Sequence, residues 1–396
     1  MHVIVLENQP SSQRGGQELI LLDVCRGLAK RGHSISLLYL EEGNLLQQYQ
    51  EFCTNVIKIN NFLLDRSTIA DSFTFFRDIW RIPVSKNSVV YSNRYHDVVF
   101  GFLLSLFKAI PFVCYLQLPP HQEKFGRPHT LGLKGVQKFI ALSKQTKADW
   151  INFGLREDKI DIVHVGINLK VYKSADDFSV VKKEWNIPTD TRVISYIGRI
   201  DREKGLEILI KAFALLVKRG ISARLLIAGR PVAHSSLEAG EQYKKFLEQL
   251  ATNLGVDKDV KFLGHVTNTT SVYQVSDVTV LPSVWSEPFG RVIIESMACG
   301  TPVVASRTGG IPEILTGEFQ NGLVEPGNEE ALSDALNSVV DWRERDPQFG
   351  NRCREHVLSK FNLDKMIDGI EQVLLKVTER RDSASYPRSQ SQSEAV

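Results

Sequence analysis

The chain has 396 residues, of which 43% are hydrophobic and 24% are charged, and this length and balance are typical of two or three globular domains. The composition excludes a wholly disordered, collagen-like or coiled-coil protein, and a formal net charge of +2 excludes the strong basic surplus expected of a nucleic-acid binder. The five cysteines are scattered without a C-x-x-C pair, so we expect neither a disulfide framework nor a zinc site, and we predict a reducing, cytoplasmic location.

The N-terminal half predicts alternating strands and helices. The segment MHVIVLENQP lacks the basic region and long apolar core of a signal peptide, so we interpret it as a first strand. Leu21, Cys25 and Leu28 recur at helical spacing, and an apolar run at 35–40 completes a βαβ unit. Further short apolar runs indicate a parallel sheet with helices on both faces; they lie at 56–59, 89–91, 112–116, 139–141 and 160–163.

A polar stretch at about 170–191 predicts a crossing into a second domain of the same type. Its expected strands lie at 193–198, 223–229, 260–264, 278–282 and 302–306. The chain is therefore predicted to be an α/β protein with two Rossmann-like β/α/β domains. The predicted parts are a first domain at 1–170, a second at 171–362, a C-terminal helix at 363–378 packing back toward the first domain, and a disordered tail at 379–396.

Two glycines stand between the first predicted strand and its helix. In Arg14-Gly15-Gly16 the missing side chains allow close backbone approach, and the helix N-terminus offers unpaired N–H groups to an anion. This pattern favours a phosphate-facing loop. The spacing is not G-x-G-x-x-G, so an ordinary turn remains the alternative interpretation.

The segment GRIDREKG at 198–205 places two cations at the carboxyl end of a predicted strand, the edge where open α/β sheets bind ligands. Arg199 can grip phosphate oxygens with its planar guanidinium, and Lys204 adds a mobile point charge. Together they suit a leaving diphosphate. The alternative is a solvated loop with a salt bridge to Asp201 or Glu203.

The segment 282–315 carries two carboxylates eight positions apart. Glu287 begins the loop EPFG, and Glu295 lies one turn inside a helix that starts near Arg291. Carboxylates accept paired hydrogen bonds from vicinal hydroxyls, so they suit a sugar or a ribose, while the helix N-terminus suits a phosphate. Alternatively, Glu295 is a surface partner of Arg291 at i, i+4, and Glu287 is a turn residue.

These residues resemble the retaining glycosyltransferases of the GT-B fold, in the family 4-like group called glycosyl transferases group 1. The resemblance spans nearly the whole chain and implies two domains facing each other across a cleft. Its most specific part is the E-x7-E pattern from Glu287 to Glu295, with its GTPVVAS and GGIPE continuation. The other matching stretches are the double glycine, Arg31-Gly32-His33, HVGIN at 164–168 and GRIDREKG.

The resemblance implies transfer of a hexose from a UDP- or GDP-linked sugar to a hydroxyl of a saccharide or lipid-linked acceptor. It also implies a reaction without a metal or other cofactor, in which positive side chains take the place of a cation. Carried over by position, Arg199 and Lys204 would clamp the diphosphate, together with Gly15 and Gly16. Glu295 would hold the ribose, and Glu287 would hold the sugar with the backbone of Phe289, Gly290 and Arg291. The base would lie near Gly264, His265 and Val266.

One departure from the family concerns Gln117 in YLQLPPH, which occupies the place where members often have a histidine near the reacting carbon. Glutamine cannot serve as a proton carrier at neutral pH, but it can replace a histidine that acts by hydrogen bonding, so Gln117 stays among the predicted catalytic residues. His121 and His96 are weaker candidates, better interpreted as an exposed and a structural histidine. Val165 stands where members of the family commonly have asparagine, and this difference does not weaken the resemblance.

Acceptor recognition is expected in the first domain, around residues 93–97 and 121–131. The segment 121–135 carries Lys124, Arg127 and Lys134, so it is open to two interpretations: peripheral contact with an anionic membrane or acceptor, or a simple surface loop. The sequence does not indicate an oligomeric state.

Two alternatives to a transferase stay open. A nucleotide-sugar epimerase or hydrolase could use the same scaffold, because fold alone does not fix chemistry. A non-catalytic or degenerate subunit that binds a nucleotide sugar is supported only by Gln117. A glycosidase is disfavoured, because nothing marks a second catalytic carboxylate across one bond.

Overall fold

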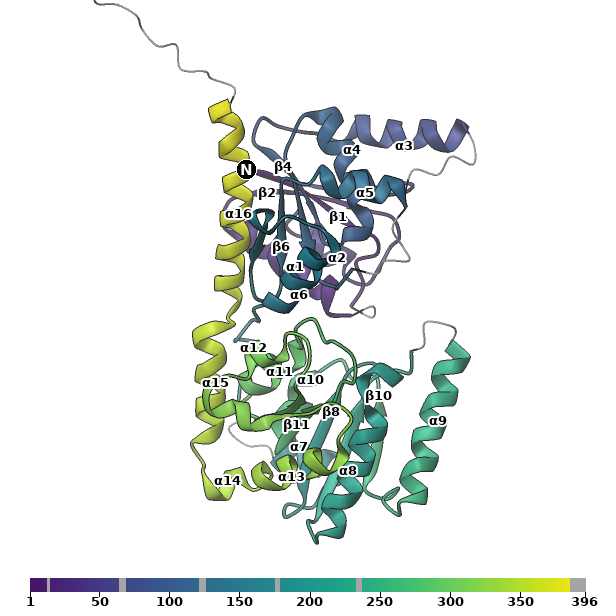
Figure 1. Ribbon diagram of the computed structural model, residues 1–396, viewed down its shortest axis with the longest axis vertical. Coiled ribbons are helices and arrows are strands. Elements are labelled where there is room, and N and C mark those ends of the chain that lie inside the picture. The colour runs from purple at the N-terminus through teal and green to yellow at the C-terminus, as the bar shows by residue number, and fades with distance from the viewer. Residues whose placement is uncertain (13–14, 64–68, 121–125, 175–178, 233–236, 385–396) are drawn as a thin grey trace, which may run out of the picture. The chain divides into compact units, whose positions relative to one another are not determined.

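The computed structural model describes residues 1–396 except 13–14, 64–68, 121–125, 175–178, 233–236 and 385–396. The chain divides into two compact units (Figure 1). One unit consists of Met1–His164 together with the chain from Asp364 onward, and the other consists of Val165–Leu363. The division therefore falls after His164, where the sequence analysis placed it after residue 170.

The first unit is a seven-stranded parallel sheet in the order β3-β2-β1-β4-β5-β6-β7. Its central strands are buried because their apolar runs face helices on both sides. The strands are β1 (His2–Glu7), β2 (Ser34–Tyr39), β3 (Asn55–Lys58), β4 (Ser88–Ser92), β5 (Phe112–Leu116), β6 (Lys138–Ala141) and β7 (Ile160–Ile162). The helices are α1 (Gly16–Lys30), α2 (Leu46–Gln50), α3 (Ile69–Arg81), α4 (Val98–Lys108), α5 (Arg127–Lys134), α6 (Lys144–Phe153) and α16 (Leu363–Ala384).

The C-terminal helix α16 packs against α1 within this unit. A Cβ at Gly27 would lie 2.1 Å from Ile367 Cδ1, so a larger residue there would force the Ile367 side chain to move. Arg31 and His33 each lie 2.5 Å from the carboxylate of Glu371. The Arg31-Gly32-His33 motif therefore anchors α16. The helix continues through Ala384, so residues 379–384 are helical instead of belonging to the predicted tail.

The second unit is a six-stranded parallel sheet in the order β10-β9-β8-β11-β12-β13. Its last strand was not predicted, because two residues are too few to show a periodicity. The strands are β8 (Arg192–Ile197), β9 (Ala223–Ala228), β10 (Val260–Gly264), β11 (Val278–Leu281), β12 (Val303–Ser306) and β13 (Leu323–Val324). The helices are α7 (Ser179–Glu184), α8 (Leu206–Lys218), α9 (Leu237–Asn253), α10 (Thr269–Val275), α11 (Arg291–Ala298), α12 (Ile311–Ile314), α13 (Glu329–Val339), α14 (Trp342–Arg345) and α15 (Phe349–Lys360).

Each sheet has one place where the strand order reverses. In the first unit β1 lies between β2 and β4, and in the second unit β8 lies between β9 and β11. The loops that follow the two neighbouring strands leave the sheet in opposite directions there, which opens a crevice suited to a ligand. Both predicted Rossmann-like domains are confirmed, as is their parallel topology. Among the helices in the described ranges, none is long and apolar enough to cross a bilayer.

Candidate functional site

Lys204 and Glu287 form an ion pair at the reversal point of the second sheet. Lys204 lies in a 3-10 turn after β8, and Glu287 lies in the loop after β11. The Lys204 Nζ to Glu287 Oε2 distance is 2.5 Å, and Ser283 Oγ donates to the same oxygen at 3.1 Å. Both charged side chains are largely buried, so water screens the pair only weakly.

Two glycines allow the loops of this site to approach. Gly205 has a φ of +68°, and a Cβ there would lie 2.0 Å from Pro282 O. Gly309 has a φ of +56°, and a Cβ there would lie 1.9 Å from the carbonyl oxygen of Glu287. Gly310 N donates to that same oxygen at 2.8 Å. The GGIPE segment of the predicted motif thus fixes the backbone of Glu287.

Arg199 follows β8 and stays partly in solvent, with 37% of its side chain exposed. Its Nη2 lies 3.3 Å from Asp201 Oδ2, so the salt bridge considered as an alternative is present. Burial raises the pKa of Asp201, while Arg199 and Lys204 oppose this rise. Tyr196 Oη donates to the carbonyl of Arg199 at 2.6 Å and holds the loop. Arg199 therefore retains an exposed guanidinium beside the Lys204 loop.

Glu295 is buried on α11 and accepts three hydrogen bonds. Arg291 Nε donates at 2.7 Å and Tyr172 Oη at 2.9 Å to Oε1, and Tyr273 Oη donates at 2.8 Å to Oε2. Burial raises the pKa of Tyr273 well above its usual value, and the charge of Glu295 adds to this rise. Both phenols therefore stay protonated as donors. The alternative interpretation predicted that Glu295 pairs with Arg291 on the surface. The pair is present, but Glu295 is buried.

Sequence reasoning missed Tyr172 and Tyr273, because no local pattern connects them to Glu295. Their rings lie 6.3 Å apart in an edge arrangement. Both belong to a small apolar cluster that Leu263 and Val266 also contact. The predicted base-side loop with Gly264 and His265 is thus adjacent to the cluster around Glu295. Phe289 is buried, and Gly290 stands at the N-cap of α11 with a φ of +97°.

The first unit holds the remaining predicted residues. Gly15 and Gly16 stand at the N-terminus of α1, and Arg14 lies outside the described residues. Gln117 is buried; its Nε2 donates to Asn93 Oδ1, and its Oε1 has no hydrogen-bond partner. Asn93 Nδ2 in turn donates to the carbonyl of Gln17 at 3.1 Å. Gln117 is thus tied to the first turn of α1. The contribution of Gly15, Gly16 and Gln117 to the donor site stays a prediction.

Of the two weaker histidine candidates, the structure describes only His96. His96 stacks on Tyr95 with ring centroids 4.0 Å apart, which fits a structural residue. His121 lies outside the described residues.

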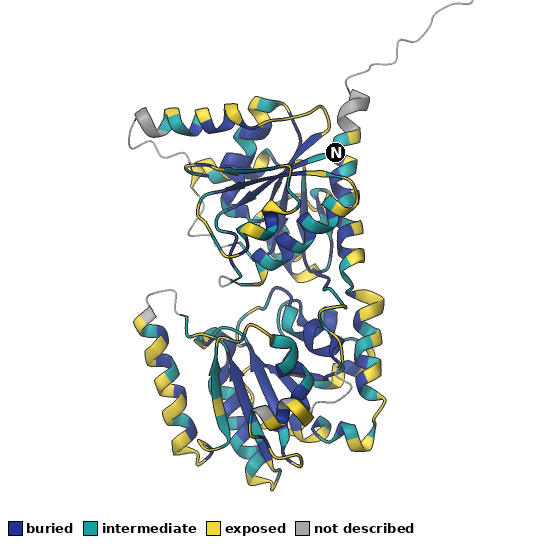
Figure 2. Cartoon of the chain, turned by 180° about the vertical axis from the view of Figure 1, so that it is seen from behind, coloured by how far each residue is buried: buried dark blue, intermediate teal, exposed yellow. Residues whose placement is uncertain are grey.

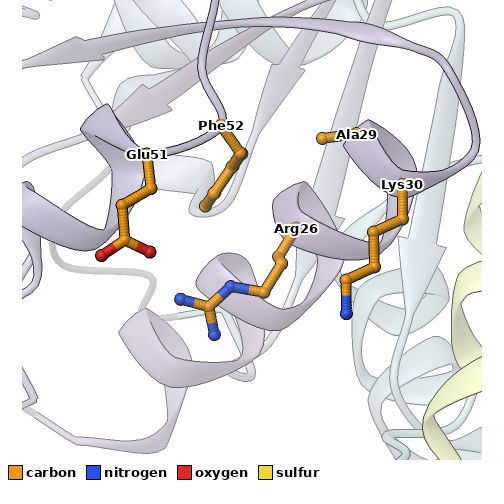
Figure 3. Close-up of a pocket in the computed structure, with 5 residues that line it drawn as sticks. All are labelled: Arg26, Ala29, Lys30, Glu51 and Phe52. Atoms are coloured by element: carbon orange, nitrogen blue, oxygen red, sulfur yellow. The ribbon is translucent and has the colours of Figure 1, made fainter.

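Arg94 and Asp97, in the expected acceptor segment, form a forked ion pair in which the nitrogen-to-oxygen distances are 3.2 Å. A shallow pocket beside α1 is lined by Arg26, Ala29, Lys30, Glu51 and Phe52, none of which was predicted (Figure 3).

A buried carboxyl ends β1 at the reversal point of the first sheet. Glu7 is 1% exposed; its Oε1 accepts from Asn8 N at 2.8 Å, and its Oε2 has no hydrogen-bond partner. Burial raises the pKa of Glu7 to about 7, Arg94 opposes the rise, and Glu18 and Asp97 add to it. Glu7 therefore changes charge near neutral pH.

We expect Glu7→Gln to stabilise the protein at neutral and alkaline pH. The carboxyl ionises near pH 4.5 when unfolded and near 7 when folded, so wild-type stability falls as the pH rises through this window. At 1.36 kcal/mol per pKa unit, the cost above pH 7 is on the order of 3 kcal/mol. Urea unfolding of both proteins from pH 5 to pH 8 measures the difference. A difference that does not change with pH would contradict the assignment.

Two family models match the chain, one on each half. The model described as Glycosyltransferase Family 4 matches residues 14–171, and the model described as Glycosyl transferases group 1 matches residues 177–356. An uncharacterized glycosyltransferase of Methanocaldococcus jannaschii is 28% identical over 379 residues, which cover 89% of this chain and 92% of that protein. The D-inositol 3-phosphate glycosyltransferase of Corynebacterium efficiens is 34% identical over 206 residues, about half of each protein (50% and 47%).

Solved structures share the fold. HepE of Anabaena, in a complex with UDP and glucose, superposes with a TM-score of 0.81 at 22% identity, covering 95% of this chain and 100% of that one. Sucrose-phosphate synthase of Thermosynechococcus elongatus superposes with a TM-score of 0.72 at 21% identity, covering 98% and 100%. The fold is therefore the GT-B fold. With family matches on both halves, the chain belongs to the family 4-like group 1 glycosyltransferases.

Proposed function

We propose that this glycosyltransferase moves a hexose from a UDP- or GDP-linked sugar to a hydroxyl of a saccharide or lipid-linked acceptor, with retention and without a metal. The observation that carries the proposal is the buried Lys204–Glu287 pair at 2.5 Å, in the loops after β8 and β11. These loops flank the reversal point, and Glu295 follows on α11. Of the UDP- and GDP-linked donors, the complex of HepE with UDP favours the UDP-linked sugar.

In the proposed reaction, the bond between the sugar C1 and the diphosphate oxygen breaks, and its electron pair leaves with the diphosphate. The acceptor oxygen forms the new bond to C1 on the same face, and its proton passes to the leaving phosphate. Negative charge grows on the diphosphate as the bond breaks. Lys204 and the exposed guanidinium of Arg199 stabilise that charge, as does the N-terminus of α11, and a metal ion would otherwise supply this stabilisation.

Glu287 and Glu295 divide donor recognition in this proposal. Glu287, fixed by the Gly310 N–H and by Lys204, presents its carboxylate to the sugar together with the backbone of residues 289–291. Glu295 accepts ribose hydroxyls with the acceptor capacity left beside its three protein donors, because a carboxylate has about four lone-pair sites. The loop 264–266 borders the base.

A thermal-shift panel of UDP, GDP, ADP and their sugar conjugates tests the donor. A ligand at a hundred times its Kd adds about 2.7 kcal/mol to the stability of the folded state, so we expect a rise of several degrees with the matching nucleotide. Glu295→Ala should reduce the rise and provides the internal control. No rise with any nucleotide would refute the donor assignment.

Transfer itself needs a separate measurement, because a non-catalytic subunit would also bind the nucleotide. Gln117, which cannot act as a general acid or base at neutral pH, is the observation that keeps this second candidate open. With a labelled donor and an acceptor panel, we expect a product whose anomeric configuration by NMR matches that of the donor and whose yield survives EDTA. An inverted product or loss of activity with EDTA would overturn the mechanism, and binding without transfer would favour the non-catalytic candidate.

A further inference from the structure

The outer face of α3 exposes aromatic side chains and an arginine along one stripe. Phe73 is 67% exposed and Trp80 is 66% exposed. They are seven residues apart, almost two full turns, so they lie on the same face of the helix, with Arg77 exposed between them. Figure 2 shows exposed positions recurring along α3. Ile79, on the opposite face, is buried in the core of the first unit. The exposed stripe is therefore not needed to attach α3 to its own unit.

The end of α4 extends this apolar face. Leu106 is 59% exposed, and Phe107 is exposed beside it. The ring of Phe107 lies 6.5 Å from that of Trp80 and 5.6 Å from that of Phe76. Two helices thus share one apolar surface, and the loop that follows α3 adds Val84 and Lys86. We call this the α3–α4 surface; its helical members are Phe73, Arg77, Trp80, Arg81, Leu106, Phe107 and Lys108.

The exposed charges of this surface are positive. Lys108 Nζ donates to the carbonyl of Trp80 at 2.8 Å and lies 5.6 Å from the centre of its ring. Arg81 and Lys86 are exposed. In the described segment 72–108 both acidic residues, Asp78 and Asp97, are buried and ion-paired with arginines. Asp78 thus balances the charge of Arg81, and the segment 72–108 holds no exposed carboxylate.

We propose that the α3–α4 surface binds an anionic lipid bilayer. Tryptophan and phenylalanine suit the boundary between acyl chains and headgroups, and flanking lysine and arginine attract anionic lipids. A second copy of the same surface fits poorly, because an isologous contact would set these cations against one another. The inference goes beyond the proposed transfer, since no predicted site residue belongs to this surface. It also differs from the membrane contact expected at 121–135, of which 121–125 lie outside the described residues.

Co-sedimentation with vesicles tests the proposal on the full chain. We expect binding at low salt to vesicles of phosphatidylcholine with phosphatidylglycerol, weak binding to pure phosphatidylcholine, and release at high salt. The double variant Phe73→Ser/Trp80→Ser should lower the partition coefficient at least about tenfold, because it removes the inserted apolar area. The double variant Arg77→Gln/Lys86→Gln should lower binding to the anionic vesicles and leave binding to pure phosphatidylcholine vesicles unchanged.

Matched variants in the second unit provide the controls. Leu358→Ser removes an exposed apolar side chain, and Lys218→Gln/Lys258→Gln makes the same change in net charge. Both should bind as the wild type does, and unchanged melting temperatures show that all variants fold. Absence of binding to anionic vesicles, or equal losses in test and control variants, would overturn the proposal. Self-association that Phe73→Ser/Trp80→Ser abolishes, without vesicle binding, would assign the surface to a second copy instead.

Discussion

Lys204→Ala is expected to lower kcat by about a hundredfold or more while changing donor affinity much less. The ammonium group interacts most strongly with the diphosphate when its charge increases during bond breaking, so the loss falls on the transition state. Its position is set by Glu287 at 2.5 Å and by the Trp285 ring, whose centre lies 5.5 Å away. Initial-rate kinetics with varied donor concentration separate kcat from KM.

The control for this variant is Lys211→Ala. The side chain of Lys211 is 43% exposed, and its carboxylate partner Glu329 lies 3.8 Å away. Its removal therefore makes the same change in net charge without touching the site. Its kinetics should match the wild type. Lys204→Ala leaves Glu287 with Ser283, so the melting temperature of the variant must be recorded alongside its rate. An unchanged kcat in a folded Lys204→Ala protein would remove Lys204 from the mechanism.

Glu295→Ala is expected to weaken nucleotide binding and also to lower the free energy of unfolding by about 3 to 5 kcal/mol, as breaking a buried ion pair does. Arg291 would lose a carboxylate at 2.7 Å, and the hydroxyls of Tyr172 and Tyr273 would lose their acceptor. Urea unfolding measures the stability, and titration calorimetry with the nucleotide at a temperature where the variant is folded measures the affinity.

Three further variants separate the two effects of Glu295. Glu355→Ala removes an exposed glutamate of α15 and should change neither quantity. Tyr172→Phe and Tyr273→Phe each remove one donor while keeping the carboxylate, so each should cost about 1 kcal/mol of stability and retain nucleotide binding. Wild-type affinity in folded Glu295→Ala would contradict the ribose role, and wild-type stability would contradict the burial of the network.

The sequence predicted the parallel strands of both sheets, because a buried parallel strand is a short apolar run and such runs are visible locally. It also predicted the loop position of Glu287 and the helical position of Glu295, since the E-x7-E spacing lies within one loop and helix. It did not predict β13, which has two residues, or the extension of α16 to Ala384 through a polar sequence. Polar surface helices show no strong apolar periodicity, so their ends are poorly marked.

The sequence by itself thus determined the α/β class, the paired sheets and the identity of the charged residues at the sheet edge. Only the tertiary structure decided which of them are partners. Lys204 pairs with Glu287 because β8 and β11 are adjacent in the sheet, which brings together loops far apart in the chain. Glu295 on α11 accepts hydrogen bonds from Tyr172, which lies 123 positions away in the chain, and from Tyr273 on the separate helix α10. The α3–α4 surface exists because Trp80 and Phe107 meet across two helices. Local periodicity records which face is buried, whereas contacts between distant segments depend on strand order, which only the folded chain fixes.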